Sequence, residues 1–203
     1  MKILNLYAGI GGNRKSWSDE HQVTAVEYDK NIAAVYGDLY PQDELVIGDA
    51  HQYLLENYDR FDFIWSSPPC QSHSSFRHNI GVRFRGVAPK YPDMTLYEEI
   101  VFLEHYAKGL WVVENVNPYY TPMRSPKKID RHLYWSNFDI PEHEVVVEKL
   151  REAQIPQLEK LHGVDLSTYK LPNKRQVLRN CVYHQTGAYI LRVAEQEFAN
   201  ATH

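Results

Sequence analysis

Cysteines and long apolar runs are scarce in this 203-residue chain. The two cysteines, Cys70 and Cys181, lie on unrelated segments, so we expect no disulfide framework and a reducing, cytoplasmic setting. Uninterrupted apolar runs are only a few residues long, which is too short for a membrane span. The N-terminal residues lack the long apolar core and cleavage site of a secretory signal. Repeats are also absent, and the length favours one domain or one domain with a small appendage.

Patterned metal ligands are missing as well. The ten histidines are scattered, and none stands in zinc spacing with the two cysteines, so no metal site is expected. With 43% hydrophobic and 24% charged residues, the composition is that of an ordinary globular protein.

Positive charge is clustered although the net charge is −4. That total argues against a general nucleic-acid coat protein. Between Ser72 and Pro92, however, no acidic residue occurs. Phosphate binding needs local positive potential rather than a positive total, so a polyanionic partner is predicted. The basic residues form three clusters: Arg77, Arg83, Arg85 and Lys90; Arg124, Lys127, Lys128 and Arg131; and Lys174, Arg175 and Arg179.

Apolar runs alternate with helical patterns along most of the chain. Such alternation predicts an α/β fold with a mostly parallel sheet and right-handed crossovers. The segment 145–161 mixes strand and helix signals and is broken by Pro156. We expect strands at 2–7, 23–28, 44–48, 61–66, 110–113 and 132–137, a loop at 72–92, and helices at 13–20, from 29 to 40, 52–58, 93–108 and 176–198.

A glycine-rich turn, Tyr7-Ala8-Gly9-Ile10-Gly11-Gly12, joins the first strand to the next segment. Glycines there let backbone N–H groups approach a ligand closely, although the spacing is not G-x-G-x-x-G. Glu27 ends the second strand, where a carboxylate commonly binds ribose hydroxyls. Tyr28 could stack on an adenine, and Asp49 could accept from its amine. Together they predict an adenosine-containing cofactor.

The run Phe61–Gln71 reads as a buried strand that stops at Pro68-Pro69 and presents Cys70. A lone thiol at a strand end is a candidate nucleophile. A thiolate that adds to C6 of cytosine makes C5 reactive, and an electropositive loop end would favour that thiolate. A second run ends at Glu114, which could bind N3 and the 4-amine of the base. Cytosine in a duplex must be flipped out for this attack.

These segments resemble the DNA (cytosine-5) methyltransferases. The resemblance implies a Rossmann-like fold dependent on S-adenosylmethionine, with helices on both faces of the sheet. The matching segments are Leu4–Gly12, Val26–Tyr36, Gly48-Asp49, Phe61–Gln71, Thr95–Ile100 and Val112–Val116, with a weaker match at Arg179-Asn180-Cys181-Val182.

The resemblance also implies roles for individual residues. It makes Cys70, Glu114 and Arg131 catalytic. The implied cofactor site contains Tyr7, Ala8, Gly9, Gly11, Gly12, Glu27, Tyr28, Asp49, Ala50, Pro68, Leu96 and Asn180. The implied nucleic-acid contacts are Gln71, Arg77, Arg83, Arg85, Lys127 and Lys128, and the 72–92 loop would close over the flipped base.

Three departures from the family pattern stand out. The family pairs two arginines spaced one residue apart, whereas this chain has Asp130 and His132 there with Arg131 between them. Arg131 would serve if the register slips by one residue. Arg179 stands where the family has glycine. The third departure is a short target-recognition segment, so we divide the chain into a catalytic core at 1–136, a reduced recognition segment at 137–175 and a returning C-terminal helix at 176–203.

The resulting hypothesis is methylation of cytosine C5 in double-stranded DNA through a Cys70–C6 adduct, with S-adenosylmethionine as cofactor. Three alternatives remain. One is methylation of cytosine in RNA. Another is amino-group methylation, suggested by Ser67-Pro68-Pro69 but disfavoured by Cys70. The last is a non-catalytic homologue that binds cofactor, which leaves open a homodimer or a partner subunit.

Overall fold

The structure is a computed structural model that describes residues 1–143 and 153–201. It contains a seven-stranded sheet in the order β3-β2-β1-β4-β5-β7-β6. The first five strands in that order run parallel, while β7 is antiparallel to both β5 and β6. The predicted mostly parallel sheet is thereby confirmed. The strands are β1 (Lys2–Leu6), β2 (Gln22–Glu27), β3 (Glu44–Ile47), β4 (Phe63–Ser66), β5 (Leu110–Val116), β6 (Lys127–Ile129) and β7 (His132–Ser136).

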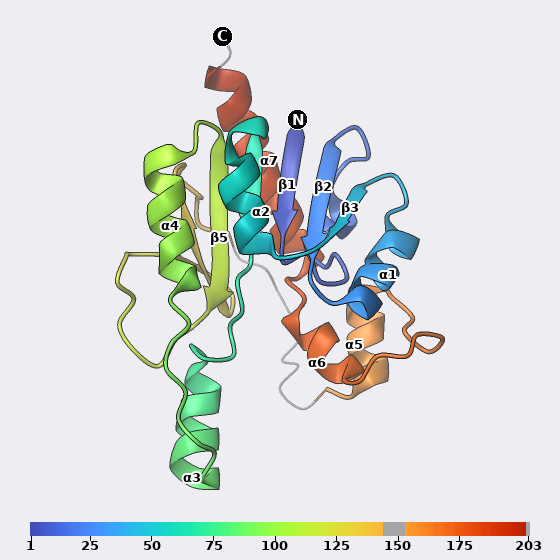
Figure 1. The fold of residues 1–203 in the computed structure, drawn as a ribbon, viewed down its shortest axis with the longest axis vertical. Coiled ribbons are helices and arrows are strands. Elements are labelled where there is room, and N and C mark those ends of the chain that lie inside the picture. Colours follow the sequence, from blue (N-terminus) through green and yellow to red (C-terminus); the bar gives the residue numbers. More distant parts are fainter. Residues whose placement is uncertain (144–152, 202–203) are drawn as a thin grey trace.

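Helices cover both faces of the sheet, as predicted (Figure 1). One face carries α2 (Ala50–Asn57) and α4 (Thr95–Tyr106), and the other carries α1 (Lys30–Leu39) and α7 (His184–Ala201). Two further helices, α5 (Ile155–His162) and α6 (Lys174–Asn180), lie together beyond the carboxyl ends of the strands (Figure 1). None of the helices in the described ranges has the length and apolarity that a membrane crossing requires.

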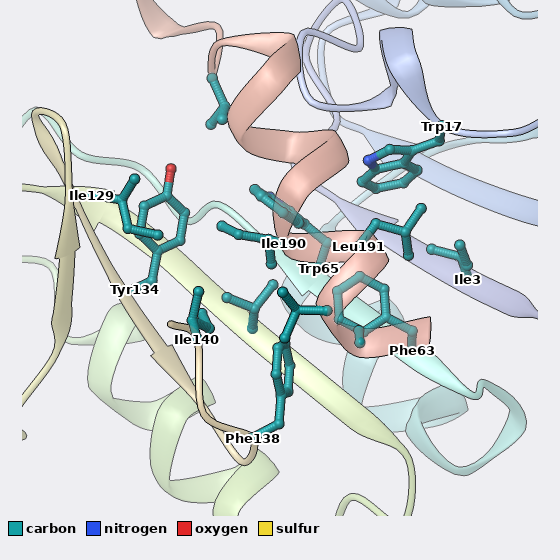
Figure 2. Packing of buried hydrophobic residues seen from close by; sticks show 14 of the residues in the cluster. Ile3, Trp17, Phe63, Trp65, Ile129, Tyr134, Phe138, Ile140, Ile190 and Leu191 are labelled. Atoms are coloured by element: carbon teal, nitrogen blue, oxygen red, sulfur yellow. The ribbon is translucent and has the colours of Figure 1, made fainter. Parts of the chain in front are cut away.

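Alternating side chains of the strands build two cores. On β1, Ile3 points to the α7 face, while Leu4 points to the α2 and α4 face. Figure 2 shows Phe63 and Trp65 of β4 packed beneath Ile190 of α7. Burying each such side chain stabilises the fold by about 1.5–3 kcal/mol. The α7 helix is therefore part of the main core, and it anchors the segment that precedes it.

Two predictions about local structure are wrong. The segment 13–20 forms only a 3-10 turn at Arg14–Ser16, and Trp17 is already extended. Short polar side chains compete with helix there, since Ser18 Oγ accepts from the backbone N–H of Glu20. The 72–92 loop instead contains a helical stretch, with a π-type turn at Arg77–Val82 followed by α3 (Arg83–Arg85). Left-handed Gly86 ends that stretch, with φ of 64°.

The C-terminal pattern was only partly anticipated. The helix predicted at 176–198 is interrupted after α6 by an extended Cys181 and resumes as α7. Gly187 lies within α7 at a point where the backbone of Asn13 packs against the position that a Cβ would occupy. Pro156 lies at the start of α5 and does not break a helix there. Residues 145–152 of the mixed segment lie outside the described residues, and the short edge strand β6 was not predicted.

Candidate active site

A pocket of about 660 Å³ lies at the carboxyl ends of the parallel strands. It opens where the strand order reverses between β1 and β4, which is where open α/β sheets bind ligands. Fourteen of the sequence-predicted residues line it together: Tyr7, Ala8, Gly9, Gly12, Glu27, Tyr28, Asp49, Ala50, Pro68, Cys70, Gln71, Glu114, Arg131 and Asn180.

The turn after β1 leaves its backbone accessible to a ligand in the pocket. Tyr7 and Gly9 both have left-handed conformations, with φ of 55° and 58°. A Cβ added at Gly9 would meet no atom within 4 Å, so the space in front of it is free for a ligand. The backbone N–H groups of Gly9 and Asp29 each donate to the Glu27 carboxylate at 2.9 Å. These bonds fix a carboxylate at the end of β2, in the position suited to ribose hydroxyls.

Other predicted cofactor residues have different surroundings. Gly11 does not line the pocket, and its Cβ would lie 2.3 Å from the ring of Tyr40. Leu96 is buried in the core beneath the pocket. Asp49 lines the pocket, but one of its oxygens caps α2 through the N–H of Gln52. Tyr28 is 79% exposed, which leaves its ring face available at the rim.

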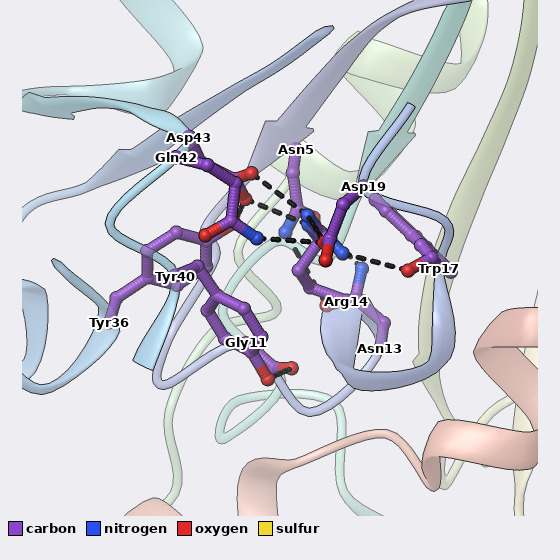
Figure 3. A network of polar contacts seen from close by, with 10 residues as sticks. All are labelled: Asn5, Gly11, Asn13, Arg14, Trp17, Asp19, Tyr36, Tyr40, Gln42 and Asp43. Atoms are coloured by element: carbon purple, nitrogen blue, oxygen red, sulfur yellow. Dashed lines mark hydrogen bonds and ion pairs between the residues drawn. The ribbon is translucent and has the colours of Figure 1, made fainter. Parts of the chain in front are cut away.

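A buried ion pair supports the glycine-rich turn from behind (Figure 3). The guanidinium of Arg14 binds both carboxylate oxygens of Asp43, at 2.8 and 3.0 Å, and both side chains are 1% exposed. The hydroxyl of Tyr36 also donates to Asp43, and that of Tyr40 donates to the carbonyl of Gly11. This network ties the segment after β1 to α1 and to the start of β3.

Cys70 stands at the pocket, after the rigid Pro68-Pro69 turn. The side-chain amide of Asn115 donates to the carbonyl of Pro68 at 3.0 Å, which holds that turn against β5. Burial and the nearby Glu114 raise the pKa of the Cys70 thiol to about 11, although the charge of Arg131 opposes them. The electropositive environment expected from the sequence is therefore outweighed by desolvation. In this state the thiol keeps its proton at neutral pH.

Glu114 of β5 faces the same pocket. Burial raises the pKa of its carboxyl to about 7, against the lowering effects of the Ser67 hydroxyl and of Arg131. His132 of β7 lies beside it and also lines the pocket. A carboxylic acid that keeps its proton near neutral pH can donate a hydrogen bond to a ring nitrogen.

Arg131 has a structural attachment in addition to its place in the pocket. Its guanidinium donates to the carbonyls of Arg179, at 3.1 Å, and Cys181, at 3.4 Å. It thus joins the β6–β7 turn to the link between α6 and α7. The residue beside Glu114 is His132, which sequence reasoning did not select. Its place at one of the family's two arginine positions was the signal that could have found it.

The C-terminal segment forms one wall of the pocket. Asn180 lines it, and its side-chain oxygen accepts from Gln176 Nε2. Gly12 meets this wall directly, because its Cβ would lie 2.7 Å from the Cβ of Cys181. Glycine is needed here for close packing of two chain segments, in addition to any approach to a ligand.

The predicted nucleic-acid residues fall in three places. Gln71 lines the main pocket, and Arg77 lines a smaller cavity with Lys90. Arg83 and Arg85 are exposed on α3, which projects away from the sheet (Figure 1). Lys127 and Lys128 belong to the edge strand β6 and do not line the main pocket. In residues 1–143 and 153–201 no cluster of three potential metal ligands occurs.

Known proteins are similar to this chain over parts of its length. A family model described as "C-5 cytosine-specific DNA methylase" matches residues 1–122. The tRNA (cytosine(38)-C(5))-methyltransferase of Mus musculus is 34% identical over 77 residues, which cover 35% of this chain and 19% of that protein. The type II methyltransferase M.NgoPII of Neisseria gonorrhoeae is 35% identical over 77 residues, which cover 36% of this chain and 23% of that protein.

The matches thus span only about a fifth to a quarter of these curated relatives. Among solved structures, DNMT2 of Spodoptera frugiperda has a TM-score of 0.40 and 25% identity, covering 57% of this chain and 35% of that one.

Proposed function

The chain belongs to the C-5 cytosine-specific DNA methylase family, whose model matches more than half of it, and from this premise we propose that it methylates C5 of cytosine in DNA. The observation that carries the proposal is the meeting of Cys70 and Glu114 in one pocket with the Gly9 turn and Glu27. S-adenosylmethionine, the cofactor of the family, supplies the methyl group. Glu27 would hold its ribose, Asp49 its adenine amine, and the open space at Gly9 its methionine part.

The chain's own residues would divide the chemistry on the base. Sγ of Cys70, as thiolate, would attack C6 of a flipped cytosine, and the π electrons of the C5–C6 double bond would shift toward C4 and N3, which makes C5 nucleophilic. The protonated carboxyl of Glu114 donates to N3 and its other oxygen accepts from the 4-amine, which stabilises the charge that develops. C5 would take the methyl group from the sulfonium of the cofactor, which leaves as the neutral thioether. Loss of the C5 proton to water or hydroxide would then re-form the C5–C6 double bond, expel the thiolate and restore the aromatic ring.

A trapping assay tests this proposal. The protein is incubated with S-adenosylmethionine and DNA containing 5-fluorocytosine, whose fluorine cannot leave C5 as a proton does. We expect a covalent protein–DNA adduct with the wild type and with Cys181→Ala, and none with Cys70→Ala. An adduct that survives Cys70→Ala, or none with the wild type on varied DNA despite bound cofactor, would refute the proposed reaction on DNA.

RNA is the second candidate substrate. The match to a tRNA (cytosine(38)-C(5))-methyltransferase favours it, and the same Cys70 chemistry would apply. Competition between unlabelled DNA and transfer RNA for transfer of a labelled methyl group separates the two. Inhibition of DNA labelling by sub-stoichiometric transfer RNA, together with methylated RNA product, would favour the second candidate.

A further inference from the structure

A fully buried carboxylate lies beneath the pocket and takes no part in the reaction described above. Glu99 of α4 is 0% exposed. It accepts hydrogen bonds from the hydroxyls of Tyr7, at 2.6 Å, and Ser66. Its Oε1 also lies 3.1 Å from Nδ1 of His51, whose pKa is raised by this hydrogen bond. A buried charge persists only where such partners compensate its lost hydration.

The three partners of Glu99 belong to three different walls of the pocket. Tyr7 follows β1, Ser66 ends β4, and His51 is the second residue of α2. Their neighbours in sequence, Ala8, Ser67 and Ala50, all line the pocket. One side chain therefore ties together the ends of the two strands between which the pocket opens, and the helix that begins beside it.

The hydrogen bond between Tyr7 and Glu99 constrains a residue whose backbone conformation is strained. Tyr7 is left-handed with φ of 55°, a conformation that is uncommon for a residue with a side chain. Such a conformation persists only where its surroundings fix it. The Tyr7 hydroxyl is anchored on Glu99, and the next residue donates its N–H to the carbonyl of Val26. The anchored ring and this backbone bond together fix the direction in which the glycine-rich turn leaves β1.

We propose that Glu99 is a positioning residue, which through the hydroxyls of Tyr7 and Ser66 holds the strand ends in the arrangement that binds cofactor. The inference rests on the proposed function, because it names what this pocket binds. Glu99 itself does not line the pocket. Its contribution is to keep the binding-competent turn populated, and a turn populated at about one part in ten would bind cofactor about tenfold more weakly.

The test compares two hydroxyl groups that each donate to a carboxylate. Tyr7→Phe removes the bond to Glu99, and Thr24→Val removes the bond of Thr24 to Glu44, on β2 and β3 and outside the lining of the pocket. Binding of S-adenosylmethionine is measured by calorimetry, and hydrogen exchange of the amides of residues 8–11 is measured without cofactor. We expect Tyr7→Phe to weaken binding and to speed exchange, each by about tenfold. Thr24→Val should change neither by more than about twofold, although both variants should unfold more easily.

A second variant shows whether the effect passes through Glu99. Glu99→Gln keeps the shape but replaces a carboxylate oxygen with a donor, so adding Tyr7→Phe to it should cause little further loss of affinity. Additive losses in the double variant would overturn the proposal. Wild-type affinity and exchange in Tyr7→Phe, or equal effects of Tyr7→Phe and Thr24→Val, would overturn it as well. A wild type that binds no S-adenosylmethionine but shows the exchange difference would refute the proposed function while leaving the positioning role in place.

Discussion

The imidazole Nε2 of His132 lies 3.7 Å from the carboxylate Oε1 of Glu114, and both side chains are 8% exposed. They are on neighbouring antiparallel strands, β7 and β5. Burial, together with the charge of Arg131, lowers the pKa of His132 to about 3, whereas burial raises the pKa of Glu114 to about 7. At neutral pH the imidazole is therefore uncharged, and the pair is not a salt bridge. Glu114 can then hold the proton that the proposed recognition of the base requires.

The pH dependence of kcat/KM should show this arrangement. Reaction needs the thiolate of Cys70, with a pKa of about 11, and the acid form of Glu114, with a pKa of about 7. Below pH 7 we expect the rate to rise about tenfold per pH unit as thiolate forms. Above it, loss of the Glu114 proton offsets that gain and the profile levels. In Glu114→Gln the rate should be lower but should keep rising through pH 7 to 9. A plateau that persists in this variant would contradict the prediction that ionisation of Glu114 causes the levelling.

Substituting His132 should change the pH at which kcat/KM stops rising. An arginine at this position would place a positive charge beside Glu114 and lower the pKa of its carboxyl, since an opposite charge favours the ionised form. We expect kcat/KM of His132→Arg to stop rising at a pH at least one unit lower than that of the wild type. His132→Asn, which is neutral like the native imidazole, is the control and should level near pH 7. Equal profiles for the two variants would show that Glu114 does not respond to charge here.

The projecting helix α3 should contribute to the salt dependence of nucleic-acid binding. Arg83 and Arg85 are both exposed on it. If each arginine neutralises one phosphate, the double variant Arg83→Gln/Arg85→Gln should have a shallower salt dependence. The slope of the logarithm of the DNA association constant against the logarithm of the salt concentration should fall in magnitude by about 2. The measurement is fluorescence anisotropy on a labelled duplex over a salt series. The same series on Lys127→Gln/Lys128→Gln tests the strand β6 cluster separately. An unchanged slope in the α3 variant would show that the arginines of α3 do not contact the DNA phosphates.

Arg14 should be among the residues most important for stability. Replacing it with leucine leaves the carboxylate of Asp43 buried without its cation, which should cost about 3–5 kcal/mol. Arg60→Leu is the matched control, because Arg60 is exposed and its guanidinium binds the side chain of Asn57 rather than a buried carboxylate. Its effect should stay below about 1 kcal/mol. Urea unfolding of the three proteins measures the difference. Similar midpoints for both variants would mean that the network in Figure 3 is replaceable.

His162 should make the fold sensitive to acid. Burial lowers the pKa of His162 to about 4, below its ordinary value of 6.5. Between those values the unfolded chain takes up a proton that the folded chain does not, so stability falls as the pH falls. From pH 7 to pH 5 this group alone should cost about 2 kcal/mol. In His162→Leu the stability lost between these two pH values should be smaller by that amount. Guanidinium unfolding at both pH values tests this, and an unchanged loss would contradict it.

Local chemistry made much of the fold and site predictable. The period of the apolar residues placed the five parallel strands, and strand-end residues such as Glu27 and Cys70 converge because parallel strands share one carboxyl edge. What failed depended on contacts distant in sequence. The side chain of Arg14 is bound by Asp43, 29 residues away, and the backbone of Asn13 packs against Gly187 of α7.

Electrostatic properties of the site were the least predictable. The sequence around Cys70 is rich in basic residues, which suggested a stabilised thiolate. Its pKa is raised instead, because burial is a property of the packed pocket and cannot be read from neighbours in sequence. The role of Glu99 was hidden for the same reason, since its partners come from β1, β4 and α2.

The contact between Gly12 and Cys181 has a consequence for how the protein is made. Residues early in the chain form the floor of the pocket, and residues near the other end of the described chain close its wall. During synthesis, the glycine-rich turn leaves the ribosome long before its packing partner does. The nascent protein therefore exposes a half-built pocket until α6 and α7 arrive, and formation of the long-range contact at Gly12 should be among the late steps of folding.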